Sequence, residues 1–218
     1  MNHRLFRGVA MVALVTLPIQ AAPDMAFNPE AILDWESHSF SGKTRYELVE
    51  TAQGKAIHAR CEGGSASGLF RRETIDLEKT PVIEWRWRVD EPLNGGDETR
   101  KSGDDFAARV YAVDEYSYLR WRTRAISYVW ASEQPTGSDW ENPHQSRAHM
   151  VAVQSGSPDD PGDGWRTQRR NLRKDFSRFH DRDLESINVI AIMTDCDDTG
   201  QPTEAWYGNI RFLPADAD

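Results

Sequence analysis

The densest group of chemically active side chains in this sequence is acidic. Asp195, Asp197 and Asp198 lie within four positions and precede a Thr-Gly turn, and a second acidic pair, Asp104 and Asp105, precedes another apolar segment. Carboxylates at this density are typical ligands of Ca²⁺, which takes about six to eight oxygen atoms. We therefore predict a calcium site if the two segments meet. The alternative is a pair of solvated turns, where Asp and Gly are common for backbone reasons.

Tryptophans in polar surroundings are the candidates for ligand binding. Trp121, Trp140 and Trp165 fall in predicted loops or at strand starts. A ring in such a position either stacks on a sugar or packs to anchor its loop. With two further polar candidates, the predicted ligand-binding set is Arg109, Trp121, Tyr128, Trp140 and Trp165.

Arg109 has two interpretations. On a partly covered strand face it needs a carboxylate partner, for which Asp105 or Asp195 would serve, because buried charges are normally paired. Alternatively it binds a sugar hydroxyl or a uronate carboxylate. Glycan cleavage is a further hypothesis, by two flanking carboxylates in a hydrolase, or by Tyr128 or His149 beside Arg109 in a lyase. The sequence contains neither G-x-S-x-G nor H-E-x-x-H.

The elements that position these residues are predicted to be short β-strands. Residues 81–89 alternate most clearly, so Ile83, Trp85, Trp87 and Val89 share a buried face. The apolar run at 188–193 indicates a strand buried on both faces. Further strands are predicted at 44–50, 55–60, 68–77, 106–113, 125–131, 148–153 and 205–212, with a short helix at 175–179. This spacing favours an all-β fold, an antiparallel β-sandwich of the jelly-roll type, with a closed β-barrel as the alternative.

The chain of 218 residues suits one domain, predicted at 35–214 after a linker at 22–34. Residues 1–21 resemble a signal peptide, with Arg4 and Arg7 before an apolar segment, so the mature protein is expected in a periplasm or outside the cell. No later segment resembles a transmembrane helix. Cleavage would change the net charge from −9 to −11, because two of the 26 basic residues would leave. Such an acidic protein is not expected to bind nucleic acid, and no pattern indicates an organic cofactor.

Two further features leave alternatives open. Cys61 and Cys196 would form one disulfide in an oxidising compartment if the fold brought them together. The basic segment 166–174 either binds an acidic polysaccharide or a partner's acidic surface, or is a solvated face paired with acids.

Several motifs together resemble a bacterial family, the domain of unknown function 3047. They are GDDFAARVY at 103–111, ISYVWA at 126–131, Arg170-Asn171, IMTD at 192–195 and Tyr207-Gly208. The resemblance implies an exported β-sandwich related in shape to carbohydrate-binding modules, with no established activity. The acidic loop departs from the family's usual Asp-Thr-Asp-Asn-Thr-Gly at Cys196 and Asp198, and Asn209 stands where Asp is common.

Three functions follow from these features. The first is an exported protein that binds a carbohydrate or similar envelope ligand without cleaving it. The second is a glycan-cleaving enzyme on the same fold. The third is a structural or partner-binding protein with a calcium-stabilised loop.

Overall fold

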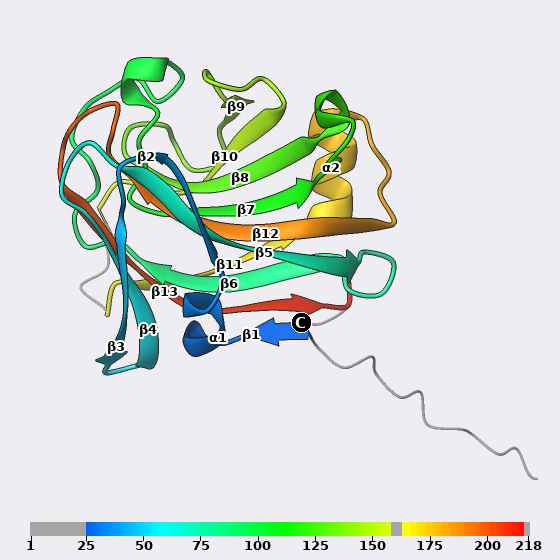
Figure 1. Cartoon of the computed structure of the whole chain (residues 1–218), viewed down its shortest axis with the longest axis horizontal. Coiled ribbons are helices and arrows are strands. Elements are labelled where there is room, and N and C mark those ends of the chain that lie inside the picture. The colour runs from blue at the N-terminus through cyan, green and yellow to red at the C-terminus, as the bar shows by residue number, and fades with distance from the viewer. Residues whose placement is uncertain (1–24, 158–162, 216–218) are drawn as a thin grey trace, which may run out of the picture.

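The computed structural model describes residues 25–157 and 163–215 and contains two β-sheets packed face to face (Figure 1). The first sheet, sheet A, has the strand order β11 (Trp165–Asn171), β6 (Val82–Arg88), β13 (Thr203–Leu213), β4 (Gly54–Cys61) and β3 (Arg45–Thr51), with β1 (Met25–Phe27) paired to β13. The second, sheet B, has the order β2 (Glu36–Ser41), β5 (Ala66–Asp76), β12 (Ser186–Asp195), β7 (Arg109–Asp114), β8 (Arg124–Ala131), β10 (Ala148–Ser155) and β9 (Asp139–Glu141). The predicted β-sandwich is confirmed and the closed barrel is wrong.

One strand pair departs from the predicted antiparallel arrangement. β10 runs parallel to β8, with Met150 opposite Ser127 and Val151 opposite Tyr128. The chain between them first forms β9, which pairs antiparallel with β10 at the sheet edge. This long connection allows the parallel pairing, since parallel neighbours need a crossover rather than a tight hairpin.

The interior is a layer of aromatic and branched side chains between the sheets. As predicted, Trp85 and Trp87 of β6 are fully buried. Their rings lie 5.2 Å from Tyr128 and 5.8 Å from Trp130 of β8, respectively, measured between ring centroids. Period-two alternation on facing strands therefore joins sheet A to sheet B through aromatic contacts.

β12 is an interior strand of sheet B and lies between β5 and β7. Ile190 and Ile192 are fully buried in the main core, as the apolar run predicted. Gly68 of β5 allows close packing here, because a Cβ at this position would lie 2.5 Å from the carbonyl oxygen of Ile192.

The predicted linker at 22–34 contains ordered elements where the structure describes it. β1 extends sheet A beside β13, and α1 (Pro29–Leu33) follows with Ile32 fully buried. Periodicity did not reveal β1, because three residues are too few to show a pattern. The strands β2, β9 and β11 were also missed, for they lie at sheet edges and carry mostly polar residues.

One helix closes an end of the sandwich. α2 (Leu172–His180) contains the predicted helix, and the side chain of Asn171 caps it by accepting the backbone N–H of Lys174 at 3.0 Å. Leu172 and Phe176 are buried in the core. The residues described contain no helix long and apolar enough to cross a bilayer. The predicted signal peptide at 1–21 lies outside the described residues.

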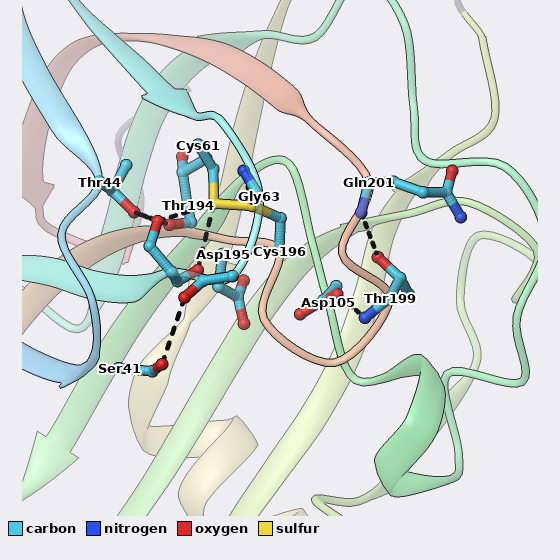
Figure 2. The surroundings of a disulfide bond; sticks show 12 residues. Ser41, Thr44, Cys61, Gly63, Asp105, Thr194, Asp195, Cys196, Thr199 and Gln201 are labelled. Atoms are coloured by element: carbon cyan, nitrogen blue, oxygen red, sulfur yellow. Dashed lines mark hydrogen bonds between the residues drawn. A yellow bond between two sulfur atoms is a disulfide. The ribbon is translucent and has the colours of Figure 1, made fainter.

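A disulfide links Cys61 at the end of β4 to Cys196 just after β12, with a Cα–Cα distance of 6.1 Å (Figure 2). It joins sheet A to sheet B across a sequence separation of 135 residues. The Sγ of Cys196 also accepts the backbone N–H of Gly63 at 3.2 Å. The cysteine pair left open by the sequence is therefore bonded in the fold.

Candidate functional site

Arg109 lies in a buried ion pair at the start of β7. Its Nε donates to Asp195 Oδ1 at 2.8 Å, and Nη2 contacts both Asp195 Oδ2 and the carbonyl oxygen of Asp104. Nη1 donates to the hydroxyl of Tyr111 at 3.3 Å. Arg109 is 3% exposed, so each guanidinium nitrogen is used inside the protein. Arg109 therefore has the predicted carboxylate partner Asp195, and its predicted role in contacting a ligand is wrong.

Burial shifts the pKa values of this cluster. It raises the pKa of Asp195 to about 8, against the opposing attraction of Arg109. It also raises the pKa of Asp104, whose Oδ2 accepts from the amide of Asn142 at 2.7 Å. Asp104 Oδ1 has no hydrogen-bond partner among the described residues, and its nearest cation is Arg109 Nη1 at 3.7 Å.

Tyr128, the predicted ligand-binding or lyase residue, is a core residue. It is fully buried between the sheets, and its hydroxyl donates to Asp175 of α2 at 2.8 Å. Arg170 completes the pair by donating from Nη2 to Asp175 Oδ1 at 2.7 Å. Burial raises the pKa of Tyr128 well above its usual value. The predicted ligand contact of Tyr128 is wrong. A strand pattern in the sequence does not show which groups surround each side chain.

The two acidic segments do meet, but backbone groups use part of their binding capacity. Asp105 is 1% exposed and accepts the backbone N–H groups of Asp198 at 3.2 Å and Thr199 at 2.5 Å (Figure 2). Asp195 is used by Arg109 and by the N–H of Phe106 at 3.1 Å. These contacts hold the turn after β12 against the loop before β7, so both acids have structural roles. The prediction of Asp195 as a metal ligand is therefore wrong, because its oxygens already accept from Arg109 and Phe106.

Two groups of side chains could still hold a cation. One atom each of Asp105, Asp197 and Asp198 lies within 4.8 Å of the others, and Asp104, Asp198 and His144 form a second such group. The all-carboxylate group suits Ca²⁺, whereas a histidine suits softer metals. His144 Nε2 lies 2.9 Å from Asp198 Oδ2. These groups contain four of the five predicted metal ligands, Asp104, Asp105, Asp197 and Asp198, and calcium binding stays a prediction.

Trp140 anchors a loop. It is half-buried in β9, and its ring lies 6.4 Å from that of Phe106 in a small apolar cluster on the outer side of sheet B. Its Nε1–H donates to the carbonyl oxygen of Glu98 at 3.1 Å. Phe106 was predicted to begin a strand at 106–113, but β7 begins only at Arg109, and Phe106 packs in the outer cluster.

Trp165 lies on the outer face of sheet A beside a cavity of about 300 Å³. Its exposure is 9%, and the guanidinium carbon of Arg86 lies 5.0 Å from its ring centroid. Gly208 allows Arg86 to lie close, since a Cβ at this position would lie 3.2 Å from the Cβ of Arg86. Trp165 therefore lines the cavity but offers no free ring face for stacking, which corrects its predicted role.

The basic segment 166–174 is mostly neutralised. Arg169 pairs with Glu84 at 2.6 Å, Arg170 with Asp175 at 2.7 Å and Arg173 with Asp183 at 2.5 Å. This arrangement agrees with the interpretation of the segment as a paired face.

Trp121 differs from the other candidates because its ring is in solvent. It lies in η2 (Arg120–Arg122), within the connection from β7 to β8, and is 63% exposed. Tyr118 in the same connection is 96% exposed. We call residues 114–124 the aromatic–arginine loop; Figure 1 shows the β7–β8 connection at the α2 end of sheet B.

Hydrogen bonds within this loop hold its exposed rings in place. The N–H of Tyr116 donates to Thr123 Oγ1 at 3.0 Å, and the N–H of Arg122 donates to the carbonyl oxygen of Leu119 at 2.7 Å. Nη1 of Arg124 donates to the carbonyl oxygens of Trp121 and Thr123, both at 2.9 Å. The rings therefore project from a closed turn, which lowers the entropy lost on binding.

Comparison with known proteins identifies the family. A family profile described as "Protein of unknown function (DUF3047)" matches residues 33–211. The chain belongs to the DUF3047 family. No curated protein matches this DUF3047 chain significantly.

Solved structures similar to this DUF3047 protein include carbohydrate-binding modules. A family 11 module from Clostridium thermocellum, in complex with a β-1,3-1,4-mixed-linked tetrasaccharide, is 15% identical with a TM-score of 0.47, covering 88% of this chain and 96% of the module. A family 30 module from a C. thermocellum cellulase is 12% identical with a TM-score of 0.47, covering 92% and 99%. The xyloglucanase domain of NopAA from Sinorhizobium fredii is 9% identical with a TM-score of 0.40, covering 89% and 99%.

Sequence reasoning missed most of the exposed loop in this DUF3047 protein. It selected Trp121 but not Tyr118 or the neighbouring arginines. The available signal was the segment YSYLRWRTR at 116–124, which places three aromatic residues and three arginines together between two predicted strands. His144 was also missed, since sequence gives no measure of its distance from Asp198.

Proposed function

We propose that this DUF3047 protein is an exported carbohydrate-binding β-sandwich whose binding surface is the aromatic–arginine loop. The observation that carries the proposal is the exposure of Tyr118 and Trp121 in one closed turn. Aromatic rings bury a large apolar area on binding while a polar edge stays in water. Sugars offer a complementary surface of C–H faces and hydroxyl groups.

The contrast with the other tryptophans supports this location. Trp140 is half-buried with its indole N–H bonded to Glu98, and the Trp165 ring is covered by Arg86. Trp85 and Trp87 fill the core. Of the tryptophans predicted to bind a ligand, Trp121 alone keeps a free ring face among the described residues.

Two features support export. The N-terminal segment is predicted to be a signal peptide. The cysteine pair forms a disulfide, and disulfides persist mainly in oxidising compartments. A periplasmic or secreted protein would meet envelope and extracellular glycans.

The geometry gives less support to glycan cleavage. Asp105 and Asp195 are 1% and 2% exposed, and backbone N–H groups or Arg109 occupy their oxygens. Tyr128 is fully buried. General acid–base catalysis needs a group within hydrogen-bond reach of the substrate, and these three lie beneath the surface.

The direct test replaces the exposed ring. We expect Trp121→Ala to weaken binding to a soluble polysaccharide by at least about tenfold, since about 1.4 kcal/mol corresponds to that ratio. Affinity electrophoresis in gels containing mixed-linkage β-glucan, dextran or polygalacturonate measures the effect. Phe40→Ala is the matched control, because Phe40 is also exposed, at 73%, but lies on β2.

Binding that survives Trp121→Ala unchanged would place the site elsewhere. An unretarded wild-type protein in every gel would contradict carbohydrate binding. Circular dichroism of both variants shows whether they fold, so a loss of binding can be assigned to the missing ring.

A further inference from the structure

We propose that the aromatic–arginine loop selects polysaccharides that carry carboxylate groups, such as uronic acid polymers; this inference rests on the proposed carbohydrate binding. The observation behind it is a group of arginines around Trp121 that form no ion pair with Asp or Glu in the part of the chain that the structure describes. Arginine binds carboxylates through two parallel hydrogen bonds, which combine charge with fixed geometry.

Ion pairs are distributed unevenly among the arginines of the described residues. Across residues 25–157 and 163–215 most arginines form an ion pair with Asp or Glu, as Arg72 does with Glu115 at 3.0 Å and Arg182 with Asp114 at 2.9 Å. Among the described residues, the arginines that form no such ion pair are Arg86, Arg120, Arg122, Arg124, Arg147 and Arg166. Arg86 and Arg166 contact Trp165, and the others lie in or beside the loop that carries Trp121.

The arginines in and beside the aromatic–arginine loop lie in one region of the molecule. Ala125 at the start of β8 donates its N–H to the carbonyl oxygen of Arg147 at 3.0 Å, which brings Arg147 beside Arg124. Arg182, just after α2, reaches Asp114 at the other end of the loop. Burial and repulsion by Arg182 and Arg147 lower the pKa of Arg124. The positive charges therefore act on one another.

Few acidic side chains are available to balance the positive charge of this region. Asp114 attracts Arg182, Arg122 and Arg124 together. The neighbouring acid, Glu115, is bonded to Arg72 on β5 by Nε at 3.0 Å. The region therefore keeps an excess of positive charge in a chain whose net charge is −9. An anionic ligand supplies the missing counter-charges, whereas a neutral glycan leaves them to solvent.

Guanidinium groups of the loop lie beside its aromatic rings. The guanidinium carbon of Arg122 lies 4.8 Å from the ring centroid of Tyr116, and Arg124 is bonded to the carbonyl oxygen of Trp121. Arg120 is exposed and flanks Trp121 directly. A sugar stacked on Trp121 would thus have guanidinium groups within reach of a carboxylate on its own ring or the next.

The test compares an acidic with a neutral polymer. Arg120→Gln combined with Arg122→Gln removes two charges and leaves the bonds of Arg124 in place. We expect polygalacturonate to bind this variant at least about tenfold more weakly than wild type, as loss of charge-assisted hydrogen bonds predicts. Wild-type binding should also weaken as salt is raised. Arg100→Gln is the control, because Arg100 is also exposed but pairs with Asp97.

The outcomes separate the two proposals. Loss of polygalacturonate binding in the double variant, with any binding of mixed-linkage β-glucan retained, supports the inference. Wild-type affinity for polygalacturonate that is no greater than for β-glucan, or that the double variant keeps, overturns it, and the proposed function still stands if Trp121→Ala abolishes binding. Failure of wild type to bind either polymer overturns the inference, and it overturns the proposed function as well if dextran is not bound either.

Discussion

Asp104 and Asp195 are carboxyl groups held away from water beside one guanidinium group. Arg109 bonds Asp195 directly but reaches Asp104 Oδ1 only at 3.7 Å. Burial raises both pKa values, and that of Asp195 reaches about 8. An unfolded chain returns each group to an ordinary value of about 3.9. The folded state therefore binds more protons than the unfolded state between these values.

This difference predicts the pH dependence of stability. Stability from these groups is present below about pH 4 and is lost as pH rises, through about pH 8 for Asp195, because the unfolded state gives up its protons first. We expect Asp104→Asn to make this decline shallower, since one of the two groups no longer titrates. Urea midpoints at about pH 5 and about pH 8 at constant ionic strength measure the effect. A variant with an unchanged slope, or a wild type that gains stability over this range, would contradict the assignment.

At the scale of elements, two long loops are joined by one carboxylate. Glu98, between β6 and β7, is 2% exposed and accepts the backbone N–H groups of Ser132 at 2.7 Å, Glu133 at 3.3 Å and Gln134 at 2.8 Å. Its carbonyl oxygen accepts from Trp140. Glu98 thus fixes the β6–β7 loop against the β8–β9 loop over the outer side of sheet B.

Glu98→Ala tests this join. The substitution leaves three backbone N–H groups without their acceptor, so we expect the free energy of unfolding to fall by about 3 kcal/mol. Urea denaturation provides the measurement, and limited proteolysis should show faster cleavage within residues 132–146. Glu91→Ala is the control, because Glu91 is an exposed acid in the same loop. Equal stability of the two variants would show that the loops hold together without Glu98.

At the scale of the whole molecule, the sandwich is held by its aromatic core and by the disulfide between the sheets. Cys61 and Cys196 close a loop of 135 residues, and a crosslink over such a distance strongly restricts the unfolded chain. We expect Cys61→Ala combined with Cys196→Ala to lower the free energy of unfolding by about 2–5 kcal/mol. Wild type treated with a reductant should show the same loss. Denaturation curves that are identical with and without reductant would exclude this contribution.

The sequence predicted the fold more fully than the site. Alternation placed Trp85 and Trp87 in the core, and the short spacing of turns predicted a sandwich. The parallel pairing of β10 with β8 was missed, since periodicity does not report strand direction.

Site prediction failed where burial decides the role of a side chain. Trp121 and Trp165 have similar polar neighbours in sequence, yet one is 63% exposed and the other 9%. Asp195 and Asp197 lie two positions apart in one acidic segment. Asp195 is nevertheless bonded to Arg109, which lies 86 positions away in the sequence. Such long-range contacts depend on the register between strands and loops, which local patterns do not specify.

The most direct test of the account is to locate the bound glycan on the folded protein. Hydrogen–deuterium exchange with and without oligogalacturonate reports which backbone amides gain protection. We expect protection in residues 114–124 and near Arg147, and none at the cavity beside Trp165. Protection confined to that cavity, or no change anywhere at saturating oligosaccharide, would contradict the assignment of the aromatic–arginine loop as the carbohydrate-binding surface.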